Sequence, residues 1–273
     1  MSDGTAGSTA IARLDCGSVL RRYRDLARQL SSRYGPGSQA VVFARYEELL
    51  AVRSMLVSRR GDPLLENRLD ELRTLVQDLY AASAPPNDAE TPWRTLVPGS
   101  PPLIEYSRAH FDSRYRPVSG QVIANTVTVT DPHRVFYQLR PRTCYMFAVT
   151  DERELRIWNR AFDLEDLAFG RNRATVGGVP VAHPMLVPER LRVFAAGEII
   201  LLGMERVEMV VANTKSGHFR PPPEAARVVR DVCRSVLHLD DRDIDVFTLF
   251  TAAAPAAAAT ADGGSATGAD APA

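Results

Sequence analysis

The chain has a single lysine and only three cysteines, and the scarcity of cysteine argues against a disulfide framework and a zinc site. Lys215 is the single lysine among 33 basic residues, and the excess of arginine and alanine indicates a GC-rich genome. Cys16, Cys144 and Cys233 are odd in number and widely spaced. No two of them have the spacing of zinc ligands, and they suggest no disulfide framework. We therefore expect a reduced, cytoplasmic protein without a metal site.

The chain also lacks excess charge and long apolar runs. Its 33 basic residues balance 33 acidic ones, whereas broad nucleic-acid binding usually needs a basic face. No stretch approaches the roughly 18 consecutive apolar residues of a membrane helix. The first residues, MSDGTAGSTAIA, have neither the positive nor the apolar region of a secretory signal. We expect no broad nucleic-acid binding and no membrane span.

Low-complexity segments flank and connect the predicted domains. Residues 1–17 are mostly small and polar, and the tail 251–273 contains only Ala, Gly, Ser, Thr, Asp and Pro, so we expect both to be disordered. Residues 83–102 are rich in proline, which stiffens the chain and removes amide donors, and they predict a linker. Trp93 should anchor this linker to a folded domain, because its side chain buries a large area.

Three helical patterns occupy residues 18–82, which we expect to form an N-terminal helical unit. Apolar residues recur there at spacings of three and four, as on one face of a helix. Asp62 and Pro63 suit the N-cap and the first position of the third helix. The apolar face leaves open a contact with a protein partner or a second copy of the chain. The side chains expected inward are Leu20, Tyr23, Leu26, Leu30 and Tyr34, then Phe43, Tyr46, Leu50 and Met55, then Leu65, Leu69, Leu72, Val76 and Leu79.

Residues 103–250 change to the period of two that is typical of strands. We predict an α+β fold, in which an N-terminal three-helix unit is followed by a mostly antiparallel sheet domain with a C-terminal helix. Strands are expected at 121–130, at 143–149 and 155–159 as one hairpin, at 193–202 and 207–213 as a second, and at 243–250. The helix after prolines 221–223 should bury Ala226, Val229, Val232, Cys233 and Val236.

The second hairpin carries the first candidate site residue, Glu198. Strand alternation places Glu198 on the same face as Ile200 and Leu202. A carboxylate on that face must reach solvent or find a partner. If Glu198 is partly buried, its pKa should rise toward the range useful for general acid–base chemistry. The alternative is an edge-strand glutamate that pairs with an arginine.

The turn after this hairpin contains His218, and the hairpin should bring it back toward Glu198. Imidazole exchanges protons near neutral pH, so His218 and Glu198 form a candidate catalytic pair, with His183 completing the pocket. Gly217 should supply a positive φ or a close approach. The alternatives are a His218 that hydrogen-bonds a backbone carbonyl to fix the loop, and a structural His183 beside its proline.

Lys215, Ser216, Gly217 and Arg220 are the candidate ligand-binding residues. Lys215 and Arg220 favour a carboxylate or a phosphate, as does the N-terminus of the following helix. Ser216 lacks the G-x-S-x-G elbow of a nucleophilic serine. We expect a polar or anionic small molecule, and the sequence leaves any cofactor unknown. The alternative is a solvated basic turn.

A second polar stretch, HFDSRYRP at residues 110–117, holds His110, Asp112 and Tyr115, and Arg114 and Arg116 flank the tyrosine. We expect a solvated loop there. The alternative is that this stretch borders the same cleft as His218.

The order His183, AAGE (195–198) and SGHFRP (216–221), followed by a helix and a strand, resembles a domain of plant IQ-motif calmodulin-binding proteins. Similar domains occur in bacterial and fungal proteins of unassigned function. The resemblance covers about residues 143–248 and implies a fold and a site, without a reaction. The family's H-S-S-F-L is HPMLV here, so only the histidine matches. No IQ motif is visible in the N-terminal helices, so calmodulin binding does not carry over.

These observations favour an intracellular enzyme or ligand-processing domain, either a hydrolase or a transferase. His218 and Glu198 would form the acid–base site, while Arg220 and Lys215 orient the substrate. The alternative is a non-catalytic regulatory or protein-binding module, or a bacterial effector or toxin. Convergence of His183, Glu198 and His218 in a concave pocket would favour the first function.

Overall fold

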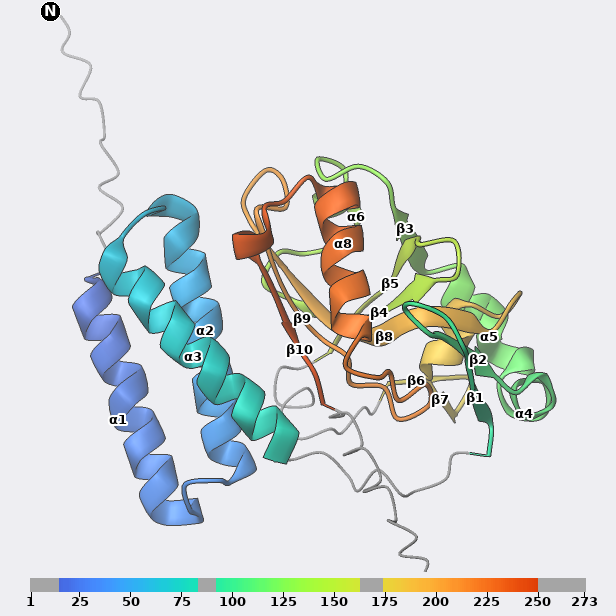
Figure 1. Ribbon diagram of the computed structural model, residues 1–273, viewed down its shortest axis with the longest axis horizontal. Coiled ribbons are helices and arrows are strands. Elements are labelled where there is room, and N and C mark those ends of the chain that lie inside the picture. Colours follow the sequence, from blue (N-terminus) through green and yellow to red (C-terminus); the bar gives the residue numbers. More distant parts are fainter. Residues whose placement is uncertain (1–14, 83–91, 163–173, 250–273) are drawn as a thin grey trace, which may run out of the picture.

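The computed structural model describes residues 15–82, 92–162 and 174–249, which form an α+β fold (Figure 1). The expected disorder of residues 1–14 and 251–273 lies outside the described residues. The helices are α1 (Cys16–Tyr34), α2 (Gln39–Ser58), α3 (Pro63–Ala82), α4 (Arg108–Arg114), α5 (Arg116–Ile123), α6 (Val135–Gln138) and α8 (Ala225–Leu237), with 3-10 turns η1 (His183–Leu186) and η2 (Asp241–Asp243). The strands are β1 (Arg94–Val97), β2 (Leu103–Tyr106), β3 (Thr126–Val129), β4 (Cys144–Thr150), β5 (Leu155–Phe162), β6 (Thr175–Val176), β7 (Val179–Pro180), β8 (Arg192–Leu202), β9 (Met209–Asn213) and β10 (Ile244–Phe247).

Capping side chains and a glycine set several ends of the three N-terminal helices. Asp15 caps α1 through Gly17, so α1 begins at Cys16, inside the segment expected to be disordered. Gly35, with φ 92°, ends α1, because a left-handed residue cannot continue the helix. Asp62 caps α3 as expected, since its Oδ1 accepts from the amides of Leu64 and Leu65.

The inward face predicted for α1 is partly wrong. Leu20 is buried, but Leu26 is 37% exposed and Tyr34 is 54% exposed. α1 packs against α2 at the outside of the unit, so only a narrow stripe of its surface is covered. α2 lies between α1 and α3 and also contacts β8 and β9, and it is buried on most of its surface.

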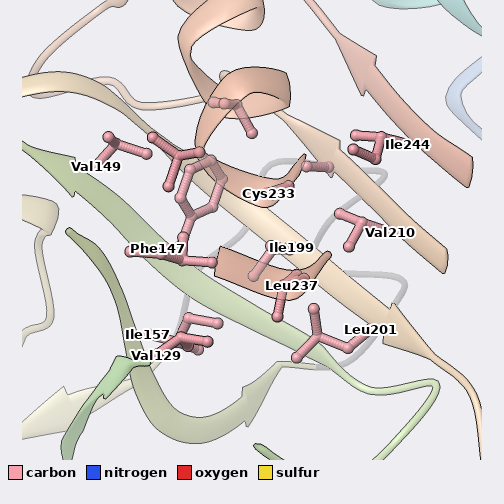
Figure 2. Packing of buried hydrophobic residues seen from close by; sticks show 14 of the residues in the cluster. Val129, Phe147, Val149, Ile157, Ile199, Leu201, Val210, Cys233, Leu237 and Ile244 are labelled. Atoms are coloured by element: carbon pink, nitrogen blue, oxygen red, sulfur yellow. The ribbon is translucent and has the colours of Figure 1, made fainter. Parts of the chain in front are cut away.

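The main sheet has the strand order β1-β2-β8-β4-β5-β3, and β9 joins the other end of β8 and pairs with β10. Every pair is antiparallel except β9–β10, and both predicted hairpins, β4–β5 and β8–β9, are confirmed. One face packs on α8: Figure 2 shows Phe147, Ile199 and Leu201 against Cys233 and Leu237.

The opposite face of the sheet is covered in two parts. The helical unit covers one part, where Leu65 and Leu72 share a core with Ile200 and Leu202. Helices α4 and α5 and turn η1 cover the other part, in a core that includes Met146. Glu198 lies near Tyr80 of the helical unit, and His218 contacts Tyr115 beside α4.

A buried ion pair joins the helical unit to the sheet. Arg53 Nε lies 2.6 Å from Asp245 Oδ2 on β10, and Arg73 Nε lies 2.6 Å from the other oxygen. The helical periodicity gave no sign of this pair, because it links positions far apart in the sequence.

Two predictions between residues 94 and 123 are wrong. Arg94–Val97, placed in the linker, forms β1 and pairs with β2, while Trp93 packs on the sheet core as expected. Helices α4 and α5 cover residues 108–123, although 110–117 was predicted as a solvated loop and 121–130 as a strand. Ser107 caps α4, and Pro117 suits the first turn of α5. The strand is reduced to Thr126–Val129, because a short alternating run does not outweigh these helix signals.

Candidate functional site

The SGHFRP loop leaves β9 by passing very close to β8. A Cβ at Gly197 would lie 1.9 Å from the backbone oxygen of Asn213, so glycine is required at this close approach. The Asn213 side chain fixes the departure, since its Oδ1 accepts from the amides of Glu198 (3.3 Å) and Lys215 (2.9 Å). The glycine of AAGE therefore has a structural reason.

His183 and Ser216 hold the loop against β8. His183 Nε2 lies 3.1 Å from the Gly197 carbonyl, which can only accept, so Nε2 carries the proton. The Ser216 hydroxyl then donates to Nδ1 at 3.1 Å and accepts from the Phe219 amide at 3.2 Å. Both side chains are buried, and burial lowers the pKa of His183 to about 3. This neutral pair resembles a serine–histidine dyad, but its polar atoms are occupied within the protein.

Glu198 is half-buried on the face predicted for it. Burial raises its pKa to about 7, against a smaller lowering by Lys215 and the Asn213 side chain. Its Oε2 is buried and has no hydrogen-bond partner in the described parts of the chain. After burial itself, the Glu198 carboxylate is the next cause that raises the pKa of Tyr80. Glu198 therefore titrates near neutral pH beside the helical unit.

His218 lies against α4 and α5, which the sequence did not predict. Its Nε2 forms a 3.0 Å hydrogen bond with Tyr115 Oη, and its ring centre lies 6.2 Å from that of Tyr106. Burial, then His110 and Arg114, lower the pKa of half-buried His218 to about 4. The stretch expected to be a solvated loop thus borders His218.

Gly217 does not have the role expected of it. Its φ is outside the left-handed region, and a Cβ there would meet nothing within 4 Å. The left-handed residue of the loop is Arg220, with φ 43°, which is buried and whose amide donates to the Ser216 carbonyl at 2.7 Å. The position in this region that has no room for a side chain is Gly197, not Gly217.

Arg94 is a member of this neighbourhood that sequence reasoning missed. It lies on β1 opposite Tyr106, and burial followed by the charge of Arg220 lowers its pKa. Sequence reasoning missed Arg94 because it lies within residues 83–102, which were predicted to be a linker. Its position directly after Trp93, the expected anchor, is the one sequence signal that it lies against a folded domain.

The predicted site residues influence one another's pKa values but group around two residues, Glu198 and His218. Lys215 lowers the pKa of both Glu198 and His183, and His218 also lowers that of His183. Glu198 lies near Lys215 and Asn213, whereas His218 lies against Tyr115 and α4. The site can therefore offer a carboxyl that titrates near neutral pH, a neutral imidazole and several cationic side chains.

Comparisons with known proteins give no match to a family model, a curated protein or a solved structure. The resemblance through AAGE and SGHFRP stays a prediction. Over residues 15–82, 92–162 and 174–249, no group of three or more His, Cys, Asp or Glu could hold a metal ion. None of the helices in these segments is long and apolar enough to cross a membrane.

Proposed function

We propose that this protein binds a polar or anionic small molecule beside His218 and exchanges protons with it, as an enzyme or ligand-processing domain. The observation that supports this is the 3.0 Å bond between His218 and Tyr115, beside the ionisable side chains of His110 and Arg114 on α4. Strongly shifted pKa values beside specific charged partners are typical of functional sites.

The charges around His218 favour an anion as the ligand. His110 and Arg114 lie near the imidazole and lower its pKa, so positive potential surrounds it. An anion bound there would offset this potential and raise the pKa of His218 from about 4 toward its ordinary value. The imidazole would then exchange protons in the useful range only when ligand is present.

Glu198 is the second proton-exchanging group in the proposal. Its pKa of about 7 matches acid–base work at neutral pH, and its Oε2 has no hydrogen-bond partner among the described residues. His183 and Ser216 are left with the role of holding the loop, because each already uses its polar side-chain atoms in the protein.

A second candidate function is binding without chemistry, as a regulatory module. The pKa of about 4 for His218 favours it, because a histidine that stays neutral at physiological pH is a weak base. In this case the ligand would bind beside His218 and be released chemically unchanged.

The test is a thermal-shift screen of phosphorylated and carboxylated small molecules, followed by NMR titration of the His218 ring with any ligand found. His218→Gln should lose the ligand response and keep its melting temperature, and Glu198→Gln should lose any turnover. His133→Gln, which changes an exposed histidine, is the matched control. An unchanged ligand response in His218→Gln would rule out the site. Binding that shifts the His218 pKa but leaves the ligand chemically unaltered would select the second function.

A further inference from the structure

A cavity of about 300 Å³ lies between the helical unit and the sheet. Its lining comes from α2 and the turn after it, from α3, from the start of β9 and from turn η2. None of the lining residues belongs to the candidate site around Glu198 and His218. The volume is at the lower end of the range for small-molecule sites, so the cavity is large enough for a second ligand.

Arg53 lies in the wall of this cavity and is only 1% exposed. Its Nε donates to Asp245 at 2.6 Å, whereas its Nη1 lies 3.8 Å from the thioether sulfur of Met209, a weak acceptor. Its Nη2 is buried and has no hydrogen-bond partner in the described parts of the chain. The outer edge of this guanidinium therefore lacks a strong acceptor, which costs free energy and needs an explanation.

The buried carboxylates near Arg53 are already bound to arginines. Arg53 Nε and Arg73 Nε lie against the two oxygens of Asp245, each at 2.6 Å. Asp243, which lines the cavity, pairs with Arg60 at 3.2 Å. Three arginines thus share two buried carboxylates, and a further negatively charged acceptor would complete the cluster.

The rest of the lining favours a ligand with one negative charge and an apolar body. Leu56 and Leu69 are buried side chains that line the cavity and would cover apolar groups of a ligand. Glu66 and Asp70 are exposed, line the same cavity and would repel a second negative charge. Asp70 also pairs with Arg73, but its side chain is 71% exposed, so this pair contributes little.

We infer that the cavity binds a small monocarboxylate. Its carboxylate accepts hydrogen bonds from Nη1 and Nη2 of Arg53, because a guanidinium holds a carboxylate through two parallel N–H groups. Its apolar body lies against Leu56 and Leu69. Met209 moves aside to admit the carboxylate, since methionine is unbranched and has three rotatable bonds. This ligand site is independent of the function proposed for His218.

Monocarboxylates from acetate to hexanoate are the probes, and inorganic phosphate is the comparison. They are titrated into the full chain, labelled at the methionine methyl groups, and followed by NMR. The Met209 resonance, identified with Met209→Leu, should shift with saturation, while that of Met204, 83% exposed, should stay in place. Affinity should rise about threefold for each methylene added, because each is buried in the cavity. Phosphate should give no saturable shift.

Two substitutions should weaken hexanoate binding by at least about tenfold. Leu69→Phe fills the cavity without removing a charge, and Leu26→Phe, on the exposed face of α1, is its matched control. Arg53→Lys keeps a positive charge beside Asp245 and removes the paired terminal nitrogens. His218→Gln should bind hexanoate like the wild type, which separates this site from the proposed function.

Four results would overturn the monocarboxylate site. The first is no saturable shift of the wild-type Met209 resonance at about 10 mM hexanoate, a concentration that reveals millimolar binding. This measurement needs no substitution in the cavity, so it decides even where Leu69→Phe or Arg53→Lys does not fold. The others are an equal shift of Met204, equal binding by a folded Leu69→Phe, and phosphate binding as tight as that of hexanoate.

Discussion

Buried ionisable residues near the SGHFRP loop respond to pH in opposite directions. Burial lowers the pKa of His183 to about 3 and of His218 to about 4, so the folded protein binds fewer protons than the unfolded chain below pH 6.5. Their contribution to stability is lost as the pH falls from there. Glu198, with a pKa raised from 4.5 to about 7, contributes stability that is lost as the pH rises through 7.

Replacement of Glu198 by glutamine should isolate its share of this pH dependence. Glutamine does not ionise, so the stability of Glu198→Gln relative to the wild type should increase by roughly 1–3 kcal/mol between pH 5 and pH 8. Urea unfolding at the two pH values measures the difference, and Glu224→Gln, at an exposed position, is the control. A constant difference between the two pH values would contradict the raised pKa.

The two glycines of the motif should tolerate alanine very differently. Gly197→Ala places a methyl group on the Asn213 backbone oxygen and should cost about 3–5 kcal/mol or prevent folding. Gly217→Ala meets open space and should change stability by less than about 0.5 kcal/mol. Thermal unfolding of both variants checks this, and equal effects would mean that the backbone at Asn213 does not approach Gly197 so closely.

At the scale of elements, the helices and hairpins were predictable where the pattern was long. α1, α2 and α3 and the hairpins β4–β5 and β8–β9 follow from periodicity and turn residues. Helices α4 and α5 did not, because the short QVIA run fits strand or helix and the cap at Ser107 decides. The contact between this segment and His218 was only the alternative prediction for the same reason, and in the structure Tyr115 at the end of α4 reaches His218.

Substitutions on the buried face of α3 should lower the free energy of unfolding more than substitutions on the outer face of α1. Leu72 is fully buried between the helical unit and the sheet, so Leu72→Ala should lose about 2–5 kcal/mol of unfolding free energy. Leu69→Ala should behave similarly, whereas Leu26→Ala on exposed α1 should cost less than about 1 kcal/mol. Denaturant unfolding ranks the three, and a large loss for Leu26→Ala would show that α1 is covered in solution.

At the scale of the whole molecule, the helical unit and the sheet share one core and one buried ion cluster. Leu65 and Leu72 pack with Ile200 and Val211, and Asp245 is bound by arginines from both α2 and α3. The change from helical to strand period correctly separated two segments of sequence. It could not reveal that they pack together, because that contact depends on residues about 190 positions apart, such as Arg53 and Asp245 with a separation of 192.

This shared core predicts a single unfolding transition. The two tryptophans, Trp93 and Trp158, both pack in the core under α4 and α5, so fluorescence reports the sheet, while far-UV circular dichroism reports mainly the helices. The two signals should coincide in a urea titration, as expected for a cooperative unit. An earlier loss of the dichroism signal would mean that the helical unit unfolds independently.

The close approach of the chain at Asn213–Lys215 to Gly197 of β8 changes what a motif search with this sequence would detect. Gly197, His183 and Ser216 together hold the SGHFRP loop close against β8. We therefore expect all three in any relative that keeps this close approach. His218 and Arg220 are not needed for that close approach. A search string built on the first three residues would therefore collect proteins of shared architecture, whereas a string that adds His218 and Arg220 would select those that share the proposed site.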